Sequence, residues 1–162
     1  MSKPEFVYMT VIAAPPEDVW DGLTMPEFTR QYWHNTRVRS DYRVGSRIEF
    51  LNEDDNVGVA GEVLVANRPG ELAYTWQFTG AESPARNDPP SRVTFRLEET
   101  SVGTRLTVIH DQLEEGSQTT TMVTFGWPHV IAGLKTLLET GKAVDFTNPE
   151  KPECPGKQAA SA

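Results

Sequence analysis

The 162-residue sequence predicts an α+β fold in which a long C-terminal helix packs over a curved antiparallel sheet. The first observation is that Thr124–Gly141 forms one helical segment with a wide apolar face. Secondly, the chain before it reads as successive strands. Thirdly, two short helices precede most of those strands. A lone helix with such a face needs a partner surface, and a helix over a curved sheet readily leaves a cavity.

The chain is expected to begin with a strand and two short helices. Phe6–Ile12 mixes apolar and polar positions, as edge strands do. Pro16 suits the first turn of a helix, and the two acidic residues after it complement the helix dipole. The segment from Pro26 to Trp33 predicts a second helix, with Thr24 as a nearby cap.

The middle of the chain reads as strands separated by turns. The expected strands are Arg47–Leu51, Val57–Ala66, Glu71–Phe78, Arg92–Glu98 and Thr104–His110. Gly58 and Gly61 permit a bulge or a sharp bend in the second of them. Gly80–Pro90 is rich in turn-forming residues and predicts a loop.

The last helix is expected to start between Gln118 and Trp127. Pro128 is either an early helix position or a kink within a longer helix, and both interpretations stay open. The composition then becomes rich in proline and poor in large apolar residues. Residues 1–144 are therefore predicted to form one domain, and residues 145–162 a disordered tail.

Composition excludes several classes of function. A formal net charge of −8 argues against binding nucleic acid or an anionic membrane surface. No apolar run approaches the roughly 20 residues of a membrane span, and the N-terminus lacks the features of a secretory signal. The single cysteine, Cys154, has no partner for an internal disulfide. We therefore expect a cytoplasmic protein without membrane insertion.

Basic residues gather in one short region, which holds Arg30, Arg37, Arg39, Arg43 and Arg47. One interpretation is a solvated surface that balances nearby acidic side chains. The other is a local rim that attracts an anionic ligand or a partner protein.

Alternation along the strands predicts which side chains face the last helix. From the strands these are Phe50, Tyr74, Trp76, Phe78, Phe95, Val108 and His110, and from the helix Trp127, Val130, Ile131 and Leu134. Trp33 is expected to close one end of the space between them. A cavity lined in this way favours a flat or aromatic ligand through ring stacking. The alternative is that these rings simply fill the core.

His110 is the leading polar candidate, because it ends a strand on the apolar face. It is either a hydrogen-bond or proton-transfer group for a ligand, or a structural histidine with satisfied partners. His34 is a weaker candidate for the rim, and His129 is expected to face solvent. The histidines are far apart and lack ligand-pair spacing, so neither a metal site nor a cofactor is expected. The sequence also contains no Gly-rich phosphate loop and no GxSxG nucleophile motif.

Several motifs, taken in order, resemble one known family. They are APPEDVW (14–20) before a helix ending in Tyr32-Trp33, GEV (61–63) leading to PGELAYTW (69–76), TRLTVIH (104–110), and GW (126–127). In this order they resemble the Activator of Hsp90 ATPase homologue-like branch of the START and pollen-allergen-like (SRPBCC) proteins. The resemblance covers about Phe6–Val144 and implies the helix-grip fold with a deep, apolar cavity. Many single-domain relatives are bacterial.

Three functions compete on this basis. The first is binding of a small hydrophobic or aromatic molecule in the cavity. The second is a cyclase/aromatase-like or hydrolase-like enzyme in which Tyr74 and His110 orient the substrate and move protons. The third is a co-chaperone or protein-interaction module for an Hsp90-type ATPase. It ranks last because the co-chaperone carries an additional N-terminal domain, which does not precede the first strand here. A homodimer is compatible with each of them.

Overall fold

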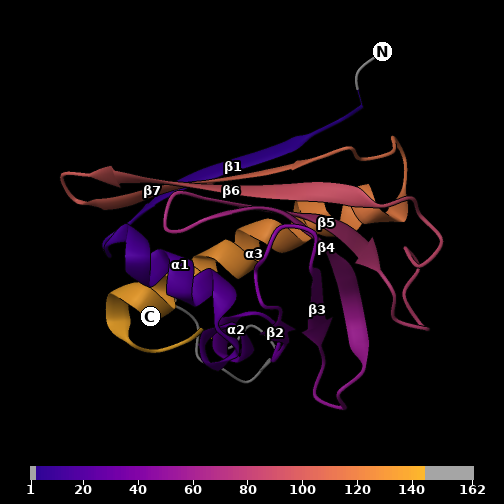
Figure 1. Cartoon of the computed structure of the whole chain (residues 1–162), viewed down its shortest axis with the longest axis horizontal. Helices are drawn as coiled ribbons and strands as arrows, with labels where there is room; N and C mark the ends of the chain where they lie inside the picture. Colours follow the sequence, from indigo (N-terminus) through magenta and orange to yellow (C-terminus); the bar gives the residue numbers. More distant parts are fainter. Residues whose placement is uncertain (1–2, 145–162) are drawn as a thin grey trace, which may run out of the picture.

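A seven-stranded antiparallel sheet forms one layer of the computed structural model, which describes residues 3–144 (Figure 1). Its strands lie in the order β1-β7-β6-β5-β4-β3-β2. Their bounds are β1 (Phe6–Ile12), β2 (Arg37–Arg39), β3 (Arg47–Leu51), β4 (Val57–Asn67), β5 (Glu71–Phe78), β6 (Ser91–Thr100) and β7 (Gly103–Asp111). The predicted α+β class and antiparallel sheet are confirmed. The short strand β2 was missed, because three residues carry no readable alternation.

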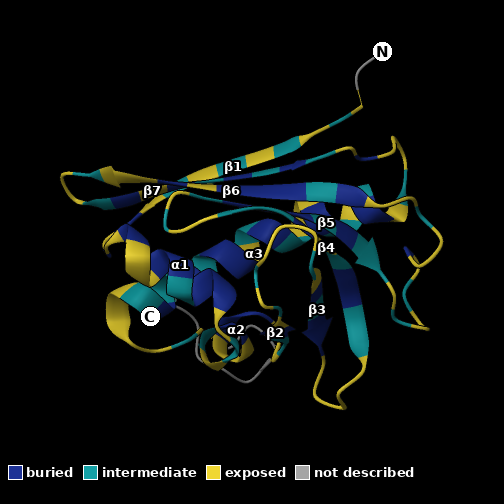
Figure 2. Cartoon of the chain, in the orientation of Figure 1, coloured by how far each residue is buried: buried dark blue, intermediate teal, exposed yellow. Residues whose placement is uncertain are grey.

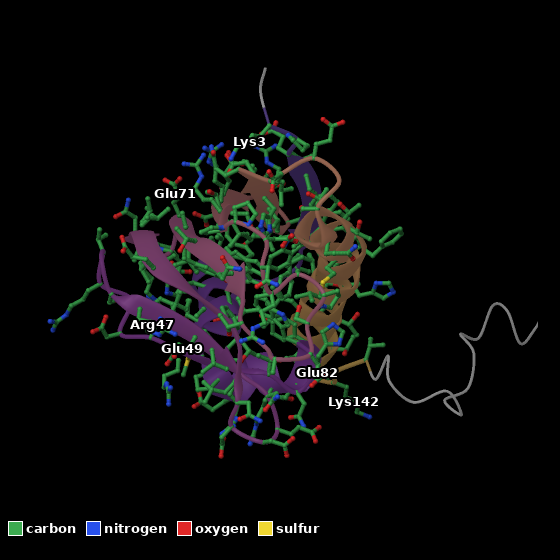
Figure 3. All side chains as sticks on the ribbon, turned by 90° about the vertical axis from the view of Figure 1, so that its right-hand side faces the viewer. Lys3, Arg47, Glu49, Glu71, Glu82 and Lys142 are labelled. Atoms are coloured by element: carbon green, nitrogen blue, oxygen red, sulfur yellow. The ribbon has the colours of Figure 1, made fainter. Side chains whose placement is uncertain are left out.

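The second layer consists of helices α1 (Pro16–Thr24), α2 (Pro26–Tyr32) and α3 (Gln118–Thr140). The sheet curves around α3, and the short helices lie beside it on the same face (Figure 1). Buried residues concentrate between the two layers (Figure 2), and their side chains fill that space (Figure 3). The predicted helix-grip arrangement is therefore present. The tail predicted at residues 145–162 lies outside the described residues.

Prolines start both short helices, as expected. Pro16 and Pro26 each occupy the first turn, where a missing N–H costs little. Thr24 was wrong as a cap, because Met25 takes the cap position and no side chain bonds there. The Thr24 hydroxyl instead donates to the Trp20 carbonyl at 2.8 Å, within α1.

Helix α3 starts at the early limit of the expected range. Ser117 caps it, its Oγ accepting from the backbone N–H of Thr120 at 3.1 Å. The Asp88 carboxylate accepts from the backbone N–H and the hydroxyl of Thr119, at 2.8 and 2.9 Å. These two hydrogen bonds tie the loop before β6 to α3. The negative charge of Asp88 is also favourable at the N-terminus of a helix. Pro128 lies inside the helix, so its interpretation as an early helix position was wrong.

No helix in the described range, residues 3–144, is both long and apolar enough to cross a membrane.

The two glycines of β4 have different roles. Gly58 is the unpaired residue at a register shift, since Phe50 faces Val59 and Leu51 faces Val57. Gly61 lies where β4 and β5 approach closely: a Cβ there would be 1.8 Å from the Thr75 carbonyl oxygen. The expected bulge is therefore found at Gly58. The second register shift, between Val63 and Val65, involves neither glycine.

We expect Gly61→Ala to destabilise the protein by about 3 kcal/mol, because the new methyl group meets backbone atoms that cannot move without parting two strands. Gly58→Ala is the control in the same strand, since the nearest atom to its Cβ is 3.9 Å away. Urea unfolding measures both. Equal stability losses in the two variants would contradict the close approach at Gly61.

Candidate functional site

An aromatic cluster occupies the space between the sheet and α3, with Trp76 at its centre. Six rings have centroids between 5.4 and 6.4 Å from that of Trp76, namely Trp33, Phe50, Tyr74, Phe78, His110 and Trp127. Alternation along β5 places Tyr74, Trp76 and Phe78 on the face toward α3. Tilted and edge-on contacts of this kind stabilise the cluster beyond the burial of its area.

His110 joins three strands and α3 through hydrogen bonds. The indole N–H of Trp127 donates to His110 Nδ1 at 3.0 Å. The other ring nitrogen, Nε2, lies 2.7 Å from Ser91 Oγ on β6. Ser91 Oγ is in turn 3.5 Å from the Trp76 carbonyl oxygen on β5. His110 thus connects α3 to the centre of the sheet.

These partners define the protonation state of His110. An indole N–H only donates, so Nδ1 must be the acceptor and the single proton of the neutral ring lies on Nε2. That proton is donated to Ser91 Oγ, whose own hydroxyl donates toward the Trp76 carbonyl. Burial lowers the His110 pKa from 6.5 to about 3. The arrangement supports the structural interpretation of His110.

A pocket of about 180 Å³ opens beside this cluster, at the N-terminal half of α3. It is lined by Trp33, His34, Trp76, Phe78, Met122, Val123, Gly126, Trp127 and Val130. The five helix residues recur at helical spacing on one face of α3. Apart from the imidazole of His34 and the indole N–H groups of the three tryptophans, the lining side chains are apolar.

A second pocket, of about 340 Å³, adjoins the first. Both are lined by Trp33, His34, Trp76, Phe78 and Met122. The second extends from these residues toward β3, β4 and the loop after β5, where Asn52, Glu82 and Ser83 make it more polar. The two pockets therefore form an apolar inner part and a more polar outer part around shared residues.

His34 lies at the rim that both pockets share. Partial burial and the nearby His129 both lower the pKa of its imidazole. His129 is exposed, as the sequence predicted, and its Nδ1 lies 3.0 Å from the Phe125 carbonyl oxygen.

The twelve predicted cavity residues divide into two groups. Those that line one or both pockets are Trp33, Phe50, Trp76, Phe78, Trp127 and Val130. Those buried in the core, each at most 1% exposed, are Tyr74, Phe95, Val108, His110, Ile131 and Leu134. The structure therefore brings all twelve together on facing surfaces, but the second group lines neither of these two pockets. The inner pocket lies beside the N-terminal half of α3.

Several pocket residues were not among the predicted ones. Met122, Val123 and Gly126 precede Trp127 on the same helix face. A helix start fixed at Gln118 would have identified them by their helical spacing from Trp127. Ser91 and Asp88 carried no sequence signal, because their roles depend on strand register and on the path of a loop.

The arginine-rich region is largely paired with acidic residues of its own surface. Arg39 and Arg47 both bind Glu49, at 2.6 and 2.9 Å. Arg47 and Glu49 lie on the side of the sheet away from α3 (Figure 3). Arg37 pairs with Asp55. The hydrogen bonds from Arg39 and Arg47 lower the pKa of Glu49, and the one from Arg39 has the larger effect. The pairs support the interpretation as a balanced, solvated surface, and exposed pairs of this kind stabilise little.

Comparison with models of protein families shows to which family the chain belongs. The model of the "Activator of Hsp90 ATPase homolog 1-like protein" family matches residues 13–139. The chain belongs to this family. The match runs from the end of β1 almost to the end of α3, so it includes every residue that lines the two pockets. No curated protein matches the sequence.

Solved structures of other proteins share the fold. A protein from Mesorhizobium loti is 26% identical, with a TM-score of 0.70 over 83% of this chain and 96% of that one. The Aha1 dimer from Colwellia psychrerythraea is 20% identical, with a TM-score of 0.68 over 86% and 99%. An Hsp90 activator from Plasmodium falciparum is 16% identical, with a TM-score of 0.67 over 83% and 95%.

The buried state of His110 predicts a specific pH dependence. The unfolded chain protonates this ring near pH 6.5, whereas the folded protein does so only near pH 3. Since the unfolded state then binds more protons, stability falls as the pH drops through this interval. We expect the free energy of unfolding to fall more steeply in the wild type than in His110→Gln. Between pH 6 and 4 the slope of the unfolding free energy against pH should differ between the two proteins by about 1.4 kcal/mol per pH unit.

Urea unfolding at several pH values measures both slopes. Acidic side chains whose lowered pKa does not depend on His110, such as Glu49, are present in both proteins, so their contributions cancel. Parallel pH profiles would mean that His110 is not held neutral by its surroundings.

Proposed function

We propose that the protein binds a small, flat, uncharged aromatic molecule in the pocket between α3, β5 and the end of α2. The observation that carries this proposal is an apolar hollow bordered by three indole rings. Ligand pockets are typically lined in this way, by apolar and aromatic side chains with few polar groups.

The dimensions favour a ligand of modest size. The outer pocket, at about 340 Å³, lies at the low end of the roughly 300–1,000 Å³ typical of small-molecule sites. The inner pocket is smaller, at about 180 Å³. A fused two-ring compound suits this space better than a long-chain lipid does.

The ring geometry favours an aromatic ligand. Trp33 and Trp76 lie nearly parallel, at an interplanar angle of 14° with centroids 6.3 Å apart, and both line the two pockets. Phe78 meets Trp76 edge-on, at 82°. A planar ligand inserted among these side chains gains about 0.5–1.5 kcal/mol from each good ring contact.

An enzymatic role for Tyr74 and His110 finds less support. Neither residue lines the two pockets, and both ring nitrogens of His110 already have partners, Nδ1 as an acceptor and Nε2 as a donor. Burial raises the Tyr74 pKa well above 10 and lowers that of His110 to about 3. Proton transfer is most effective when the pKa lies near the working pH, and both groups are far from it.

A second candidate is stimulation of an Hsp90-type ATPase, which family membership favours. We expect the isolated domain to stimulate an Hsp90 ATPase by less than about twofold, because the pairing of Arg37, Arg39 and Arg47 leaves little unpaired positive charge on that surface. ATPase assays with increasing protein concentration measure this. Strong, saturable stimulation would make the co-chaperone role primary.

A side chain that fills the pocket should raise the stability of the protein and at the same time block ligand binding. Gly126 lies on the pocket face of α3, and a Cβ added there meets nothing within 4 Å. We expect Gly126→Leu to stabilise the protein by up to about 1 kcal/mol, since leucine favours helices over glycine. The same side chain should abolish the rise in Tm that 2-acetylnaphthalene causes in the wild type.

Gly126→Ala is the matched control, because it gains the same helix preference without filling the pocket. It should keep the ligand-induced rise in Tm. Equal ligand effects in wild type, Gly126→Ala and Gly126→Leu would place binding elsewhere, and no effect in any of the three would contradict binding of this probe.

A further inference from the structure

The first half of strand β1 is an open edge of the sheet. Within residues 3–144, β1 pairs with β7 alone. The strand at the other edge, β2, has three residues, and the Val38 N–H donates to Thr29 Oγ1 of α2 at 3.2 Å. Exposed edge strands invite pairing with another chain, so most proteins shorten or cover them. The edge at β2 is short and covered, whereas β1 has seven residues.

Two side chains of α3 cover the second half of the β1 edge. The Lys135 ammonium donates to the Val11 carbonyl oxygen at 2.5 Å. The Glu139 carboxylate accepts from the Ala13 N–H at 2.7 Å. Both backbone groups bond to α3 and therefore point away from β7. The edge is thus closed at its C-terminal end by charged groups that bind the backbone.

The backbone groups of Val7 and Met9 are open. Those of alternate residues point to the same side of a strand, so they face away from β7, as the Val11 carbonyl does. No other strand of the described chain pairs with them. Their side chains are 54% and 60% exposed, and exposed residues alternate with half-buried ones along β1 (Figure 2). The strand also carries none of the charged side chains that normally prevent pairing.

This segment is complementary to a second copy of itself. We propose that two chains pair antiparallel through β1, with Val7 of each opposite Met9 of the other and Tyr8 on the two-fold axis. This register uses all the open backbone groups of Val7 and Met9. It also places apolar side chains opposite each other on one face and the two Tyr8 rings together on the other. A shift of two residues would instead leave Met9 opposite the charged Glu5.

Charge complementarity favours a second copy as the occupant. In this register Glu5 lies opposite Val11 of the other chain, beside the Lys135 ammonium that binds the Val11 carbonyl oxygen. The strand pairing ends there, because that carbonyl already has a partner. The opposite charges attract, and the same contact forms twice about the two-fold axis. The chain's own N-terminal segment therefore supplies both the hydrogen bonds and the charge that the open edge requires.

Sedimentation equilibrium of the full-length protein measures the association. A single pair of strands makes a small interface, so we expect a Kd on the order of 100 μM. Met9→Lys places a charge on the edge and should weaken association by at least about tenfold. Val44→Lys is the matched control, because Val44 is 72% exposed outside β1 and the substitution adds the same charge. A wild-type protein that stays monomeric at about 1 mM would overturn the proposal.

Disulfide formation tests the register separately from the affinity. In a Cys154→Ser background, which removes the single native thiol, Tyr8→Cys places two thiols on residues whose Cα atoms lie about 4.5 Å apart. Met9→Cys is the control, since its two copies are diagonal neighbours about 7–8 Å apart. Under mild oxidation we expect the first variant to form covalent dimers at least about tenfold faster than the second. Equal rates, or an association that Met9→Lys leaves unchanged, would place the interface elsewhere and overturn the proposal.

Discussion

The hydrogen bond from Trp127 to His110 is the contact on which the arrangement of the core depends. It joins α3 to β7 inside a region from which water is excluded, where an unpaired partner would be costly. His110 in turn reaches Ser91 on β6 and, through it, the β5 backbone at Trp76. The position of the helix over the sheet is therefore set by directional bonds as well as by apolar packing.

This anchoring explains why the hollow lies where it does. Around His110 the space between the layers holds the ring of Trp127, which contacts the rings of both Phe95 and Trp76. The unfilled space lies toward the N-terminal half of α3, where Gly126 has no side chain and Met122 is flexible. The Trp76 ring lies between the two parts, because it contacts Trp127 and also lines the pocket.

Much of this arrangement could be predicted from periodicity. Alternation in β5 and β7 identified the side chains that face α3, because a buried sheet face imposes a period of two. Whether those side chains meet each other or a ligand could not be predicted. That outcome depends on sub-ångström packing and on hydrogen bonds such as Ser91 to His110, between residues far apart in sequence. The expected cap at Thr24 was wrong for a local reason. Pro26 occupies the first turn of α2, so the residue directly before it, Met25, takes the cap position.

The measurement that tests the central claim most directly is a crystal structure of the protein with 2-acetylnaphthalene. The expected result is a naphthalene ring among Trp33, Phe78 and Met122, with His110 still bonded to Trp127. Ligand density on the outer face of the sheet, or density in the pocket reached only by breaking the Trp127–His110 bond, would contradict it.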